Sequence, residues 1–93
     1  MANHGIGGYN HIEKEGDFAF RMDGEHLELH HWCPKFRVCI TPVRINTPAG
    51  DTPTGRYWNF DGNFECPSVT PSIGCDIAPR CGRHKTLIKG VFV

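Results

Sequence analysis

Residues Asp17–His30 read DFAFRMDGEHLELH and carry the clearest structural pattern of the chain. Apolar and polar residues alternate on both sides of Asp23-Gly24, and an Asp-Gly pair between two alternating runs is typical of a two-residue hairpin turn. In that hairpin we expect Phe20 to lie opposite Leu27. The stretch therefore predicts two antiparallel strands with one apolar face.

The same alternation predicts which side chains after the hairpin face the core. Residues two apart on a strand share a face, so His31 and Cys33 are expected to point inward together with Leu29. The opposite face carries a polar set that is expected to be solvated: Arg21, His26, Glu28 and His30.

Further strands are expected over 36–45 and 56–60, with a Pro- and Gly-rich loop over 46–55 between them. Lys89-Gly90 is expected to close a terminal hairpin. These elements predict an all-β fold: a small single-domain β-sandwich or partly open barrel of short antiparallel hairpins, stapled by zinc. Residues 1–16 are expected to form a flexible N-terminal arm, and residues 17–93 the single β domain.

The composition of the chain excludes several classes of protein. The chain has 93 residues, among them 11 Gly and 7 Pro, so its core is thin. No apolar run approaches the roughly 20 residues that span a bilayer, and the N-terminus lacks the features of a signal peptide, which favours a reducing cytoplasm. Residues 1–30 carry a net charge of −4 and residues 31–93 one of +4. Nucleic-acid binding is therefore not indicated, because its basic footprint is missing.

Five cysteines leave one unpaired in any disulfide framework, which favours metal binding over disulfides. Cys81 and His84 have the spacing of a zinc knuckle, and Gly82 permits its tight turn. With Cys33 and Cys39 they would complete a tetrahedral Zn²⁺ site.

His31 and Cys75 are reserve ligands for that site. The alternatives stay open: Cys39 is equally suited to be a small core residue, and half-buried loop thiols are the stronger interpretation of Cys66 and Cys75. Thiolates and imidazoles also suit an iron-sulfur cluster.

The second half of the chain carries three motifs: Trp58–Gly62 (WNFDG), Pro67–Ile73 (PSVTPSI), and Cys81 and His84 near Gly90. With these motifs, residues 33–92 resemble a small family common in phages and prophages, which has no settled activity and is often labelled ammonia-monooxygenase-like. It implies a location in the host cytoplasm or the virion. The motif residues themselves are expected to be structural rather than catalytic.

From these features we expect a non-enzymatic, zinc-stabilised module that binds a protein partner. The partner would be a phage structural protein, with the chain as a virion accessory, or a host defence protein that the chain inhibits; self-association into a homo-oligomer is also compatible. The alternative is a small metalloenzyme or a Rieske-like iron-sulfur electron carrier. Protease chemistry is not expected, because no Ser or Cys stands in a recognisable nucleophile motif.

Overall fold

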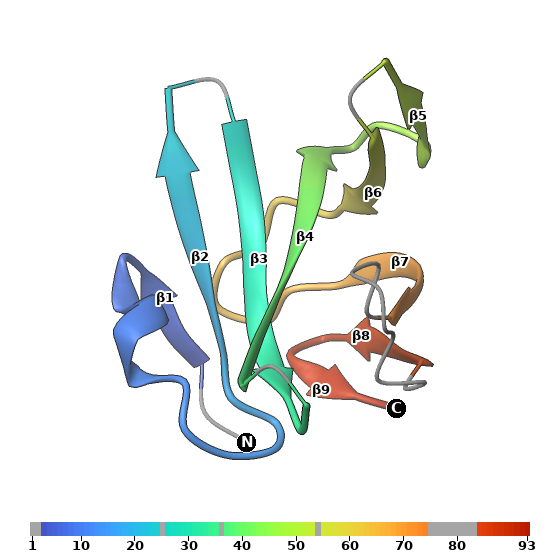
Figure 1. Ribbon diagram of the computed structural model, residues 1–93. Helices are drawn as coiled ribbons and strands as arrows, with labels where there is room; N and C mark the ends of the chain where they lie inside the picture. Colours follow the sequence, from blue (N-terminus) through green and yellow to red (C-terminus); the bar gives the residue numbers. More distant parts are fainter. Residues whose placement is uncertain (1–2, 25, 36, 54, 75–83) are drawn as a thin grey trace.

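The computed structural model describes residues 3–24, 26–35, 37–53, 55–74 and 84–93. The described residues form nine strands, one 3-10 turn and no α-helix (Figure 1). The all-β expectation is therefore confirmed. The elements are β1 (Asn3–Ile6), η1 (Gly8–His11), β2 (Phe18–Asp23), β3 (His26–Cys33), β4 (Arg37–Ile45), β5 (Gly50–Thr52), β6 (Gly55–Phe60), β7 (Val69–Gly74), β8 (His84–Ile88) and β9 (Val91–Phe92).

The strands form a single sheet in the order β1-β2-β3-β4-β6-β7-β8-β9, with β5 paired to β6. The pairs β1–β2 and β4–β6 are parallel, and the other pairs are antiparallel. The sheet curls into an open half-barrel (Figure 1). The partly open barrel, and not the sandwich, is the architecture that the chain adopts.

The core fills the concave side of the curled sheet. Its centre is the stack of Phe20 on Phe60, whose ring centroids lie 5.0 Å apart, with Phe64 edge-on to both rings. Such aromatic pairs add about 0.5–1.5 kcal/mol beyond the area they bury. The remaining buried members come from β2, β3, β4, β6, β7 and β8: Phe18, Leu29, Val43, Trp58, Val69, Ile73 and Leu87.

The first hairpin forms as expected, but its turn lies one residue later. Asp23 pairs with His26, so the register places Phe20 opposite Leu29 rather than opposite Leu27. This two-residue slip keeps every side chain on its expected face, because the side-chain period of a strand is two. His31 and Cys33 accordingly point inward and are buried.

His30 was expected on the solvated face, and this prediction is wrong. Its side chain is buried, because the ring of Tyr9 from η1 lies 5.2 Å from the imidazole ring. The N-terminal segment is thus placed against the convex side of β2 and β3, with β1 in the ladder beside β2. Its flexibility, and the arm boundary at residue 16, stay predictions.

Two other segments differ from the expected loops. The 46–55 loop contains β5, which forms a short hairpin with β6. The proline-rich stretch Pro67–Ile73, which was not among the expected strands, contains most of β7, and β7 pairs with both β6 and β8. The terminal hairpin is confirmed: Lys89 and Gly90 have φ angles of 47° and 84°, and positive φ at both central residues is typical of a type I′ turn.

Candidate functional site

The expected zinc ligands Cys33 and Cys39 lie on neighbouring strands. Both thiols face the concave side and are 2 % exposed, and Cys39 lies opposite His31 in the β3–β4 register. Within the described ranges no group of three or more His, Cys, Asp or Glu residues is placed to hold a metal ion.

The other half of the expected zinc site cannot be compared with the structure. Cys75 and Cys81 lie outside the described residues, and so does the side chain of His84, whose backbone begins β8. The ligand set of Cys33, Cys39, Cys81 and His84 therefore stays a prediction.

His31 is held in the core by a hydroxyl group. Its Nε2 lies 3.1 Å from the Oγ1 of Thr41, and its ring is 6.0 Å from that of Phe92. Burial lowers the pKa of His31 from 6.5 to about 4, with a small further decrease from the charge of His30 and an opposing effect of a backbone hydrogen bond at Trp32. The imidazole is neutral at pH 7. Although a hydroxyl beside an imidazole resembles a nucleophile and its base, Thr41 is 1 % exposed, so a substrate cannot reach it.

A second hydroxyl group, that of Ser68, holds the terminal hairpin. Its Oγ accepts a hydrogen bond of 2.9 Å from the backbone N–H of Lys89. Its own backbone N–H donates to Oδ1 of Asp61 across 3.2 Å. Ser68 thus ties the turn before β7 to the turn between β8 and β9.

Ser72, the only other serine in the chain, has different surroundings. It lies on β7 just before the buried Ile73, and its own side chain is exposed on the opposite face. Its hydroxyl group has no hydrogen-bond partner among the described residues. Ser72 therefore presents an uncommitted hydroxyl group to solvent from a strand.

The ladder between β7 and β8 brings a histidine position close to Ser72. Gly74 pairs with His84 and Ile73 pairs with Lys85, and the register shifts between Val69 and Ile73, so position 84 lies across the strand pair from the residues that directly follow Ser72. Facing and diagonal neighbours across a strand pair lie roughly 5–8 Å apart, within reach of long side chains. The register thus supplies a hydroxyl group and an imidazole position on adjacent strands.

Trp58 fixes the backbone of Ser72 from the other side. The β6–β7 ladder pairs Phe60 with Val69 and Asn59 with Thr70, and the next residue of β7, Pro71, has no N–H to donate. Where that ladder ends, the indole Nε1 of Trp58 donates to the carbonyl oxygen of Ser72 across 3.1 Å. The strand that carries Ser72 is thereby held by β8 on one side and by a buried indole ring on the other.

Ser72 was not among the expected site residues, because no serine stands in a nucleophile elbow or a similar signature. The signal available in the sequence was the count: the chain has two serines, and both lie within residues 68–72. His84 was expected, but as a metal ligand. The pairing of β7 with β8, which relates these two positions, was not.

Comparison with known proteins gives one family match. The profile of the family described as "Bacterial ubiquitination-like system serine protease (BubE)" matches residues 7–93. No curated protein and no solved structure matches the chain. No helix among the described residues is long and apolar enough to cross a membrane.

The family match corrects several expectations. The predicted function as a non-enzymatic phage accessory protein is wrong, and so is the alternative of an electron carrier. The family match indicates a protease-related function instead. The description as a zinc-binding phage protein is corrected by the same match and by the absence of a metal-binding group in the described ranges. The resemblance of residues 33–92 to the phage and prophage family is not tested. From residue 7 to its last residue, the chain belongs to the family of bacterial ubiquitination-like system serine proteases.

Proposed function

We propose that this chain is a serine hydrolase that cleaves an amide bond in a protein substrate of a bacterial ubiquitination-like system, with Ser72 as its nucleophile. The observation that carries the proposal is the contrast between the two serines. The hydroxyl group of Ser68 accepts a backbone hydrogen bond, whereas that of Ser72 is exposed and has no partner among the described residues.

His84 is the proposed general base. A serine hydroxyl is a weak nucleophile until a neighbouring base accepts its proton, and position 84 pairs with Gly74, two residues after Ser72, on the adjacent strand. The other histidines are less suited: His30 and His31 are buried, His4 and His11 lie on β1 and η1, and His26 begins β3.

The reaction follows the usual two steps of acyl transfer. Oγ of Ser72 attacks the substrate carbonyl carbon while its proton passes to the imidazole of His84. The imidazolium then gives that proton to the departing amine, which leaves an ester on Ser72. A water molecule hydrolyses the ester, again with His84 as the base, and returns Ser72 to its hydroxyl form.

The rigid placement of Ser72 supports this role. A nucleophile must be held close to its productive geometry, and β7 is anchored on both sides of Ser72. Trp58 binds the Ser72 carbonyl oxygen, and the side chain of Ile73 is buried in the core. An exposed hydroxyl group on a backbone anchored in this way combines access with orientation.

Active-site labelling tests this proposal. The full chain is treated with a fluorophosphonate probe, which reacts with activated serines, and the modified peptide is identified by mass spectrometry. We expect the label on Ser72, its loss in Ser72→Ala and strong slowing in His84→Gln. Ser68→Ala is the matched control and should still be labelled. Absence of the label from the folded wild-type protein, or a label on Ser68, would contradict the proposal.

A further inference from the structure

Asn59 carries a side-chain amide for which the fold provides no partner. It lies on β6 between two core residues, Trp58 and Phe60, so its side chain is on the opposite, convex face of the sheet. Its Oδ1 is buried and has no hydrogen-bond partner among the described residues. A buried polar group without a partner destabilises a protein. Stability therefore does not account for an asparagine at this position, whereas a ligand that bonds to the amide would.

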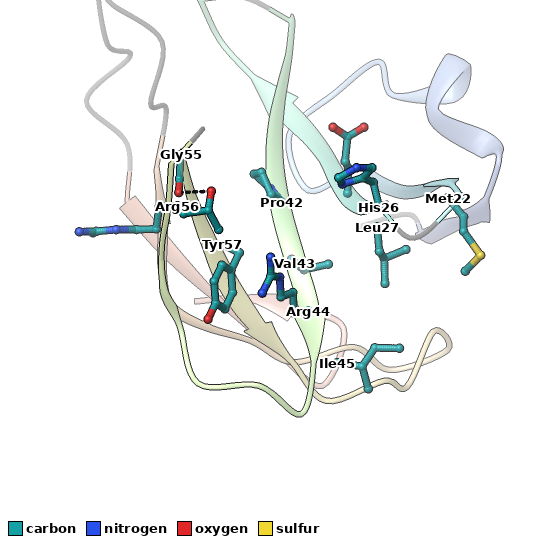
Figure 2. A pocket seen from close by; sticks show the side chains of 13 residues that line it. Met22, His26, Leu27, Pro42, Val43, Arg44, Ile45, Gly55, Arg56 and Tyr57 are labelled. Carbon is teal, nitrogen blue, oxygen red and sulfur yellow. Dashed lines mark hydrogen bonds between the residues drawn. The ribbon is translucent and has the colours of Figure 1, made fainter.

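The neighbours of Asn59 on the β4 side are engaged with each other. The β4–β6 ladder pairs Asn59 with Arg44, and Tyr57 is the preceding residue of β6 on the same face. The guanidinium carbon of Arg44 lies 4.1 Å from the ring centroid of Tyr57. Figure 2 shows these two side chains next to each other in the pocket that they line. This contact leaves the Asn59 amide for a partner on its other side.

On that other side lies the strand of the proposed nucleophile. The β6–β7 ladder pairs Asn59 with Thr70. Ser72 follows two residues later, and it shares this face because the next residue, Ile73, is in the core. Trp58 binds the carbonyl oxygen of Ser72 at 3.1 Å, which keeps β7 beside β6 beyond the end of the ladder. Facing and diagonal neighbours on adjacent strands lie roughly 5–8 Å apart, a separation that suits two short side chains acting on one substrate carbonyl group.

The order of the strands suits acyl transfer. Strand β7 with Ser72 lies between β6 with Asn59 and β8 with position 84. In acyl transfer the base removes the proton from the nucleophile, while a separate hydrogen-bond donor faces the carbonyl oxygen of the substrate. Three adjacent strands thus supply a carboxamide, a hydroxyl group and an imidazole position in that order.

We infer that the Asn59 carboxamide is the donor that stabilises the negative charge on the substrate oxygen in the reaction proposed for Ser72. When Oγ of Ser72 bonds to the carbonyl carbon, the π electron pair moves onto the oxygen, and an N–H of Asn59 Nδ2 donates a hydrogen bond to it. No proton is transferred from the amide. The electron pair returns to the C–O bond as the amine leaves with the proton from the imidazolium. This inference rests on the proposed function.

The kinetics of active-site labelling test this role. In the fluorophosphonate probe the phosphoryl oxygen takes the place of the carbonyl oxygen, and Oγ of Ser72 displaces fluoride from phosphorus. Asn59→Leu keeps the approximate shape of the side chain but removes the amide. We expect the maximal labelling rate of the full chain to fall at least about 100-fold, with little change in the probe concentration that gives half this rate.

A melting curve and a matched variant exclude a structural explanation. Because an unpartnered amide is replaced by an apolar group, Tm of Asn59→Leu should equal or exceed that of the wild type. Thr70→Val removes a hydroxyl group from the position that faces Asn59 and should be labelled at the wild-type rate. Asn59→Val, which suits a strand, is the second variant and decides the result if Asn59→Leu melts at a lower temperature.

The outcomes distinguish this inference from the proposed function. Labelling of the Asn59 variants at the wild-type rate, or equal slowing in Thr70→Val, would overturn the role of Asn59 and leave the serine hydrolase proposal intact. A change in the half-saturating probe concentration alone would also overturn it, because the amide would then act in binding. Absence of labelling in the wild-type protein would overturn both proposals. Slow labelling confined to the Asn59 variants supports the inference.

Discussion

The indole Nε1 of Trp58 donates a hydrogen bond to the carbonyl oxygen of Ser72, 3.1 Å away, beyond the end of the β6–β7 ladder. A core residue thus holds the backbone of Ser72, whose hydroxyl group has no hydrogen-bond partner among the described residues. This contact therefore links the packing of the core to the position of the proposed nucleophile.

Removing that hydrogen bond should slow the reaction more than it weakens binding. In Trp58→Phe an aromatic ring still fills the core, but the Ser72 carbonyl loses its donor. We expect the maximal rate of fluorophosphonate labelling to fall about tenfold, with little change in the probe concentration that gives half this rate, and the free energy of unfolding to fall by about 1 kcal/mol. Trp32→Phe on β3 is the matched control. Equal rates in both variants would show that Trp58 is only structural.

Ser68 and Ser72 should separate stability from activity. Ser68→Ala removes the acceptor of the Lys89 N–H and should cost about 1 kcal/mol, which lowers Tm by about 4–8 °C in a domain of this size. Ser72→Ala removes a hydroxyl group without a described partner, so its Tm should stay near that of the wild type. Calorimetry on both variants measures this difference, and a larger loss in Ser72→Ala would reverse the two roles.

Acid should destabilise the protein through His31. Its pKa is about 4 in the folded state, lowered from the ordinary value of 6.5 that applies to the unfolded chain, so between these values the unfolded chain binds more protons. The free energy of unfolding should therefore decrease as the pH falls from about 6.5 to 4, by up to about 3 kcal/mol, with no further contribution from His31 below that range. Urea titrations from pH 7.5 to 4 measure it. His31→Gln should flatten this part of the profile, and an unchanged slope would assign the effect to another group.

A second loss of stability should occur at lower pH through Asp17. Burial raises the pKa of Asp17, but the amides of Glu13 and Lys14 that donate to its carboxylate, with the nearby charge of His4, lower it below 3.8 overall. Its contribution is thus present above about pH 3.8 and is lost as the pH falls through the lowered value.

At neutral pH, Asp17→Ala should cost about 1–2 kcal/mol, because the two amides lose their acceptor. Asp51→Ala, which breaks an exposed pair with Arg56, should cost no more than about 0.5 kcal/mol. The comparison is made by urea denaturation at pH 7. Equal costs would mean that the Asp17 carboxylate does not hold this turn.

Much of the fold follows from local sequence patterns. Alternation in Asp17–His30 predicts the first hairpin, and Lys89-Gly90 predicts the last, because turn type and side-chain period are short-range properties. The position of the first turn was missed by one residue, since both registers put the same apolar residues on the same face. The burial of His30 was missed because Tyr9, which covers it, comes from a segment expected to be free.

The candidate site was harder to predict, because its parts are defined by strand pairing. Ser72 and His84 are twelve positions apart, and the proline-rich stretch around Ser72 does not alternate as a strand does. Only the β7–β8 ladder relates the two positions.

Composition and short-range patterns specify the all-β class, the two turn-defined hairpins and the inward placement of His31 and Cys33, and they restrict any serine chemistry to Ser68 or Ser72. These properties follow from composition and from periods of two residues, which act over a few positions along the chain. Only the folded chain shows which serine is engaged in hydrogen bonds and which is exposed, and that Trp58 supports Ser72. Each of these depends on contacts between strands brought together by burial of the shared core, a long-range energy that no local pattern encodes.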